Sequence, residues 1–165
     1  MPQSAGPVEP LDARAARVAA LNALARRDYS VEDLRLKLLK KGYDASVVLP
    51  LLEALRGEKL LDDRRYLENF VAYRAARGQG PLRIRVDLRR HGLQGPQVEE
   101  YLDAYPDWIM LINKARLKKF GAKPARNFAD RQLQARFLSY RGFTSAHIRM
   151  ALGFDVELDS DIDET

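Results

Sequence analysis

Three glycines at a constant spacing constrain this chain more than any other feature. Gly42, Gly92 and Gly142 lie 50 residues apart. The stretches that contain them read LRLKLLKKGYDASVVLPLL, IRVDLRRHGLQGPQVEEYL and QARFLSYRGFTSAHIRMAL, and apolar residues recur at matching positions. A fixed period of this length indicates one supersecondary unit used three times. The chain is therefore predicted to present an extended surface rather than to enclose a pocket.

The first copy is predicted to contain three helices, over residues 13–29, 31–41 and about 45–55. Asp12 and Ser30 are expected to cap the first two, because their side chains can accept hydrogen bonds from free helical amides. Pro50 falls inside the third segment. Since a proline in a helix interior costs about 3 kcal/mol, this helix is expected either to start late or to kink.

The second copy repeats the pattern, with Asp62 lying 50 residues after the first cap. Gly80 takes the second cap position, and Pro81 follows at the first helical position, where its missing N–H is harmless. Residues 82–88 alternate apolar and charged side chains, which is typical of a half-buried strand. The equivalent residues of the third copy do not alternate, so a helix is predicted here as well.

The third copy is predicted to begin its first two helices at Asp107 and Asp130. The two caps are 18 residues apart in each of the first two copies and 23 apart in the third. A longer first helix or a longer loop near residues 121–124 is therefore expected. Each repeated glycine suits the left-handed residue that ends many helices, so Gly42, Gly92 and Gly142 are predicted to be structural helix stops.

These patterns predict an all-α fold of three tandem three-helix repeats, about nine helices, in an elongated, curved, solenoid-like array. The predicted boundaries are a disordered lead over residues 1–10, repeats over 11–59, 60–105 and 106–153, and a mobile acidic tail over 154–165.

The charge is distributed unevenly along the chain. The whole chain carries a net charge of +5, but residues 155–165 hold six acids and no base. The remainder has 28 basic and 17 acidic residues, a net charge of +11. Such a body indicates a polyanionic partner or an acidic protein surface, or else a charged face that serves only solubility. The tail is a candidate internal competitor for that basic face.

The residue types needed for catalysis or metal binding do not cluster in the sequence. There is no cysteine, and His91 and His147 have no partner at metal-ligand spacing. The Gly78–Pro81 run lacks the lysine and preceding strand of a phosphate-binding loop, and Asp62 with its neighbour Asp63 reads as a helix start. We therefore expect that the protein is not an enzyme and that it binds no cofactor and no metal. The first ten residues have no apolar core for export, so a cytoplasmic location is expected.

Basic side chains instead recur on the predicted helices and are the candidate binding residues. Leucines at helical spacing are expected to face inward, which leaves the cations toward solvent in a repeated row. The aromatic residues Tyr66, Phe70, Tyr73, Trp108, Phe120, Phe137 and Phe143 have helical spacing and are expected to pack in the core rather than to stack on bases. The candidate contact residues are Arg74, Arg77, Arg83, Arg85, Arg89, Arg90, Lys40, Lys41, Lys118, Lys119, Arg126, Arg131, Arg136 and Arg141.

Three runs of this sequence resemble the RecX regulatory proteins of bacteria. They are SVEDLRLKLLKKGYD, LLDDRRYLENFVAYRAARGQGPLRIRVDLRRHGL and DRQLQARFLSYRGFTSAHIRMAL, and the resemblance extends from about Leu21 to Leu152. Leu82 departs from it, since that family often has another basic residue there. The resemblance implies three tandem three-helix repeats, no catalytic residues, and binding in the groove of the RecA–DNA filament. It also implies inhibition of the recombinase's ATPase, strand-exchange and co-protease activities.

The expected partners are accordingly the RecA filament and single- or double-stranded DNA, bound directly or through the filament, with no membrane and a monomeric state. Three other readings stay open on the residues alone. They are a general DNA- or RNA-binding helical module, a helical scaffold for acidic proteins, and an enzyme with a site hidden between repeats. A general nucleic-acid module would show steep salt dependence and no need for the recombinase.

Overall fold

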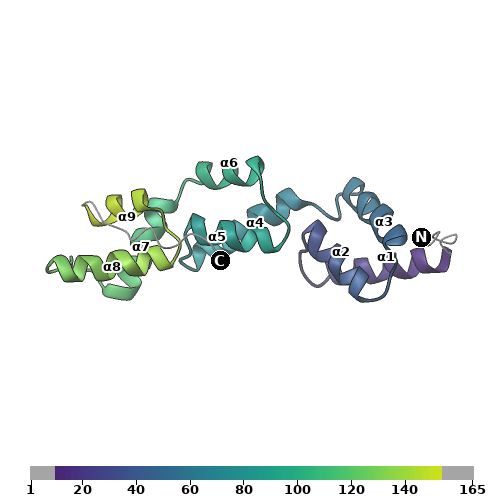
Figure 1. The fold of residues 1–165 in the computed structure, drawn as a ribbon, viewed down its shortest axis with the longest axis horizontal. Coiled ribbons are helices and arrows are strands. Elements are labelled where there is room, and N and C mark those ends of the chain that lie inside the picture. Colours follow the sequence, from purple (N-terminus) through teal and green to yellow (C-terminus); the bar gives the residue numbers. More distant parts are fainter. Residues whose placement is uncertain (1–9, 154–165) are drawn as a thin grey trace, which may run out of the picture. The chain divides into compact units, whose positions relative to one another are not determined.

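The computed structural model describes residues 10–153, and these form nine α-helices and no strand. In chain order the helices are α1 (Pro10–Leu24), α2 (Val31–Lys40), α3 (Ala45–Gly57), α4 (Asp63–Ala76), α5 (Pro81–Arg90), α6 (Pro96–Ala104), α7 (Trp108–Phe120), α8 (Phe128–Tyr140) and α9 (Ser145–Leu152) (Figure 1). The all-α repeat prediction is confirmed, including a helix where residues 82–88 alternate. The predicted lead and acidic tail lie outside the described residues, apart from Pro10, which begins α1. No described helix has both the length and the apolar character that crossing a membrane requires.

The described residues form two compact units. One comprises residues 10–69 with 89–93, and the other comprises residues 70–88 with 94–153. The first unit contains α1, α2 and α3, which pack against one another. Leu34 and Leu38 of α2 and Val48 and Leu55 of α3 are fully buried, so the inward-facing leucines of α2 were predicted correctly.

Helix α1 differs from its prediction in two ways. It begins at Pro10, so Asp12 lies in the first turn rather than at the cap. A proline fits the first helical position, and an acid in the first turn still interacts favourably with the helix dipole. The helix ends at Leu24 rather than near residue 29. Its buried side consists of Ala16, Ala20 and Ala23, whereas Val18 is exposed.

Helix α3 runs through Pro50, so the predicted late start is wrong. Asp44 caps it, accepting a hydrogen bond from the Ser46 N–H at 2.8 Å. Pro50 is exposed, while Val47, Val48 and Leu51 on either side of it are buried. The burial of the apolar face therefore offsets the hydrogen bond that the proline removes.

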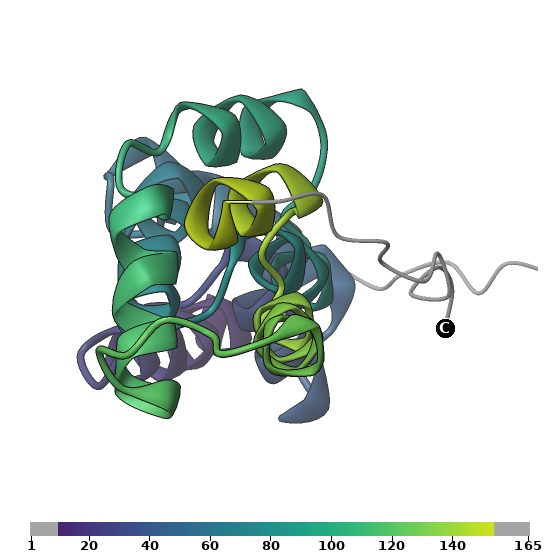
Figure 2. The ribbon, with the colours of Figure 1, turned by 90° about the vertical axis from the view of Figure 1, so that its left-hand side faces the viewer.

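In the second unit, α7, α8 and α9 pack against one another (Figure 2). The core includes Ile84 and Leu88 of α5, Ile112 of α7 and Leu138 of α8, all fully buried. The extra length of the third copy lies partly in the loop over residues 121–127 and partly in α8, which has 13 residues against 10 in α5; α7 is no longer than α4.

The caps of the third copy were partly mispredicted. Asn127, not Asp130, caps α8, because its side chain accepts the Asp130 N–H at 2.9 Å. Asp130 instead accepts hydrogen bonds from the backbone and guanidinium of Arg126, and the guanidinium bond lowers the pKa of this carboxyl. Asp107 precedes α7 but forms no capping hydrogen bond.

The aromatic residues are distributed unequally between core and surface. Tyr66, Trp108 and Phe143 are buried, as expected. Phe70, Phe120 and Phe137 are half-buried. Tyr73 is 60% exposed, so its expected place in the core is wrong. Its hydroxyl lies on the surface and accepts a hydrogen bond from Arg77 at 2.7 Å.

Candidate functional site

The end of α8 meets the start of α5 in the second unit through backbone hydrogen bonds. The Gly80 N–H donates to the Arg141 carbonyl at 2.7 Å, and the Leu82 N–H donates to the Gly142 carbonyl at 2.9 Å. The free carbonyls at a helix C-terminus carry partial negative charge, and the free amides at an N-terminus carry partial positive charge. The amides at one helix end therefore bond to the carbonyls at the other, and these hydrogen bonds hold residues 79–83 beside residues 140–142.

Glycine is required on both sides of this junction. A Cβ atom at Gly80 would lie 2.4 Å from the Gly142 carbonyl carbon and 2.4 Å from the Phe143 nitrogen. Gly142 has φ +92°, and a Cβ there would lie 2.4 Å from the Arg83 Cβ. Contacts this short do not occur between real side chains and backbone, so the junction can form only with two glycines.

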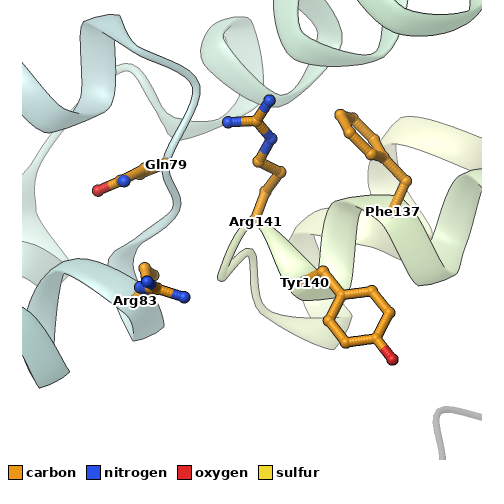
Figure 3. A pocket seen from close by; sticks show the side chains of 5 residues that line it. All are labelled: Gln79, Arg83, Phe137, Tyr140 and Arg141. Carbon is orange, nitrogen blue, oxygen red and sulfur yellow. The ribbon is translucent and has the colours of Figure 1, made fainter.

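An open pocket of about 280 Å³ lies at this junction. Gln79 and Arg83 line one side of it, and Phe137 and Tyr140 of α8, with Arg141 directly after this helix, line the other (Figure 3). The Arg141 guanidinium lies 5.3 Å from the centre of the Phe137 ring, which is a cation–π distance. The Tyr140 side chain is 70% exposed. The pocket thus offers two guanidinium groups, one amide and two aromatic rings.

A buried carboxylate holds two arginines near the pocket. Asp87 of α5 is 5% exposed, and its Oδ2 lies 3.6 Å from Arg83 Nε and 3.7 Å from Arg74 Nη1. Arg74 also lies over the Phe70 ring at 5.0 Å and approaches Gln79 Oε1 at 3.5 Å. Asp87 therefore fixes where these two cations lie, while about half of the Arg83 side chain stays exposed.

Arg85 has a different environment from the other predicted contact residues of α5. Its guanidinium forms a 2.7 Å ion pair with Glu99 of α6, and only 27% of the side chain is exposed. Arg85 therefore connects α5 to α6.

The remaining predicted cations of the second unit lie at several places on its surface. Lys119 is near the pocket, since its Nζ lies 5.8 Å from the centre of the Phe137 ring. Lys118, Arg131 and Arg136 are exposed. Arg77 is exposed beside Tyr73 on α4, and Arg126 is paired with Asp130 at the start of α8. Of the fourteen candidates, the structure brings Arg83, Arg141, Arg74 and Lys119 together around the pocket.

The first unit contains a second junction of the same kind, where residues 89–93 meet the start of α2. The Ser30 hydroxyl donates to the His91 carbonyl at 2.7 Å, and His91 Nδ1 lies 2.8 Å from Asp33 Oδ2. A Cβ atom at Gly92 would lie 2.5 Å from the Glu32 Cβ. The predicted contact residues of this unit, Lys40, Lys41, Arg89 and Arg90, are exposed at the ends of α2 and α5.

Sequence reasoning missed Gln79, Asp87 and Tyr140 as parts of the site. Gln79 and Tyr140 do lie within two of the runs that carry the family resemblance, beside Gly80 and Gly142. No pattern in the sequence marks Asp87, because its role depends on which side chains α4 and α5 bring to it. Residues 10–153 contain no group of three His, Asp or Glu side chains that could hold a metal ion.

The comparisons with known proteins agree on one family. The family models described as "RecX, first three-helix domain" and "RecX, second three-helix domain" match residues 16–55 and 62–102. The chain is 43% identical over 138 residues to the regulatory protein RecX of Halorhodospira halophila, covering 83% of this chain and 86% of that protein. It is 41% identical over 140 residues to the regulatory protein RecX of Acidithiobacillus ferrooxidans, covering 85% and 90%.

Solved structures show the same fold. The crystal structure of RecX from Lactobacillus salivarius matches with a TM-score of 0.74 at 20% identity, covering 88% of this chain and 97% of that one. A second crystal structure, of a regulatory protein RecX, matches with a TM-score of 0.73 at 25% identity, covering 87% and 74%. On the sequence matches and the shared three-helix domains together, this chain belongs to the RecX family of regulatory proteins.

Proposed function

We propose that this protein is a non-enzymatic regulator that binds the RecA–DNA filament, in its groove, and inhibits the recombinase's ATPase, strand-exchange and co-protease activities. The family supports a regulatory role, and the filament as target follows from the resemblance. Cytoplasmic location and action as a monomer belong to the same proposal. So does the use of the three repeats, with boundaries near residues 59, 105 and 153, as separate points of contact.

The observation that carries the proposal is the exposure of cations at both junctions between successive repeats. Arg83 and Arg141 border the pocket of the second unit, and Lys41 and Arg89 are exposed in the first. A filament that contains DNA presents phosphates along its length, and cations in contact with phosphates release counterions. Several modest contacts made by one chain also strengthen each other, because the later ones form within the complex.

The structure decides which arginines should be changed to test this proposal. Reversing Arg85 would place a carboxylate against Glu99 and weaken the contact between α5 and α6, so a loss of activity would be ambiguous. Arg136 and Arg141 are both exposed on or directly after α8. The variant Arg136→Glu/Arg141→Glu therefore removes predicted contacts without breaking a described ion pair.

A matched control is available in the first unit. Arg14 and Arg26 are exposed and lie outside the predicted contact set. The variant Arg14→Glu/Arg26→Glu changes the net charge by the same amount, so a difference between the two double variants reports position rather than charge.

The decisive assay is RecA ATPase activity on single-stranded DNA with and without this protein. We expect inhibition at amounts well below the recombinase, retained by the Arg14/Arg26 variant and strongly reduced in the Arg136/Arg141 variant. ATPase activity that is unchanged by the wild-type protein at any amount would refute the proposal. If inhibition requires enough protein to coat the DNA and vanishes with modest salt, the protein is instead a general nucleic-acid-binding module.

A further inference from the structure

The pocket at the α5–α8 junction carries an aromatic side chain that the fold does not use. Tyr140 belongs to the last turn of α8, yet 70% of its side chain is exposed. The neighbouring positions Leu138 and Phe143 are buried and supply the packing of this helix end. Tyr140 therefore adds little to the core, and it lines the same pocket as two arginines, with its ring directed away from the Arg141 guanidinium (Figure 3).

The cations of the pocket are held in place before any ligand arrives. Asp87 Oδ2 lies 3.6 Å from Arg83 Nε, and the Arg141 guanidinium lies 5.3 Å from the centre of the Phe137 ring. The two glycines of the junction bring the chain segments that carry these arginines into backbone contact. Arginine binds phosphate oxygens with a planar set of donors, and a fixed guanidinium loses less freedom on binding.

We infer that this pocket binds one nucleotide unit of a single nucleic-acid strand, with the phosphate on Arg83 and Arg141 and the base stacked on Tyr140. Proteins that bind single strands combine a basic groove with exposed aromatic rings in this way. The volume of about 280 Å³ lies just below the range of small-molecule sites, which limits an occupant to about one nucleotide. The carboxylates of an acidic peptide would bind the arginines but would not stack on an exposed ring.

A strand fits the surroundings of the pocket better than a free nucleotide does. Lys119 Nζ lies 5.8 Å from the centre of the Phe137 ring, and Arg74 Nη1 lies 3.5 Å from Gln79 Oε1. These cations extend the positive surface beyond the pocket itself, so phosphates on either side of the bound unit would also be stabilised. Gln79 offers an amide that can donate to or accept from a base edge.

The test uses the full chain, without recombinase, and a short labelled oligothymidine measured by fluorescence anisotropy. A second probe of the same length lacks the bases but keeps the phosphates. We expect Tyr140→Ala to weaken binding to the oligothymidine by roughly fivefold or more, as stacking of one base predicts, and to leave the abasic probe unchanged. Tyr140→Phe keeps the ring and should bind as the wild type does.

Two further variants separate the phosphate contact from the base contact. Arg141→Gln should weaken both probes and lower the salt dependence by about 0.7 for one lost phosphate contact. Phe128→Ala is the matched control, because Phe128 is 66% exposed on the same helix, about 18 Å from Tyr140 along its axis. This variant should bind both probes normally.

Each other result overturns the inference. Wild-type affinity in Tyr140→Ala, or equal losses on both probes, would exclude base stacking at this site. Competition by free thymidine monophosphate as strong as by the oligonucleotide would assign the pocket to a mononucleotide. Displacement by a glutamate-rich peptide of equal charge, with no effect of Tyr140→Ala, would assign it to an acidic protein.

A second measurement needs no variant. Photocross-linking of the wild-type protein to an oligonucleotide that carries 5-iodouracil should modify Tyr140, and cross-links found only outside the pocket would count against the inference. Since neither measurement includes RecA, a failure of filament inhibition would leave these results unaffected, and the two proposals can fail separately.

Discussion

The replacement of Gly80 by alanine tests how the junction between α5 and α8 is built. The added Cβ atom would lie 2.4 Å from Gly142 and from Phe143, and both neighbours are backbone atoms. Backbone cannot move aside as the end of a flexible side chain can. Gly80 does not have a positive φ, so an alanine there meets no dihedral strain of its own. The cost of the substitution is therefore the cost of separating the two helix ends.

The size of that cost follows from two contributions. Overpacking at a close contact costs about 1–3 kcal/mol. Separation also weakens the hydrogen bonds of the Gly80 and Leu82 amides to α8, at 2.7 and 2.9 Å, each with a net contribution of about 0.5–1.5 kcal/mol. Because one movement relieves the overlap and stretches both bonds, the contributions do not simply add. We expect Gly80→Ala to lower the free energy of unfolding by about 2–4 kcal/mol.

The assay can use the chain's one tryptophan. Trp108 is 4% exposed and belongs to the same unit as the junction, so its fluorescence reports unfolding of that unit in urea. Amide hydrogen exchange should also show lost protection at residue 80 and at Leu82. The control is Gly57→Ala at the end of α3, followed by circular dichroism, because no atom lies within 4 Å of the added Cβ and the φ of Gly57 is not positive, so this variant should be at least as stable as the wild type. A Gly80→Ala variant as stable as the wild type, with both amides still protected, would refute the close contact.

Three further substitutions test other parts of the fold. Pro50→Ala restores a helical hydrogen bond in α3 and should stabilise the protein by about 2 kcal/mol, measured by urea unfolding; no gain would show that α3 has adapted to the proline. Asp87→Asn removes the charge between Arg74 and Arg83 and should cost about 1–3 kcal/mol by the same measurement. Burial lowers the pKa of His147, so the folded protein holds this imidazole in its neutral form. The contribution of the neutral imidazole to stability is complete above about pH 6.5, the ordinary pKa of histidine, and is lost as the pH falls through the lowered pKa. His147→Phe should flatten this dependence in thermal unfolding followed by Trp108 fluorescence.

The helices themselves were predictable because the repeat allowed ambiguous segments to be compared. Residues 82–88 alternate like a strand, but they form α5 because Pro81 starts a helix and the buried Ile84 and Leu88 lie one turn apart. The glycines after α2, α5 and α8 all have positive φ. At the end of α8 the amides of Gly142 and Phe143 bond back to Ser139 and Leu138, as in the motif that typically ends helices with a left-handed residue.

Errors arose where a prediction depended on tertiary contacts. Periodicity gives weight to large apolar residues, but alanines form the buried side of α1 and Val18 on the same helix is exposed. Counting charges could not distinguish Arg85, which is paired with Glu99, from Arg141, which is exposed. Both distinctions depend on which helix lies opposite, and a single sequence does not contain that information.

The two junctions have equivalent places in the repeat but carry different side chains. Each joins the start of the second helix in one copy to the end of the second helix in the next copy. The close contact is made by Gly92 at the first junction and by Gly142 at the second. The side chains at equivalent positions differ: Asp33 and His91 are 2.8 Å apart in the first unit, whereas Arg83 and Arg141 replace them in the second. One junction therefore pairs an acid with a histidine, while the other places two permanent cations at a pocket. The backbone hydrogen bonds of the second junction do not involve the side chains of Arg83 and Arg141, so these side chains are available to a ligand, and the binding site is expected there.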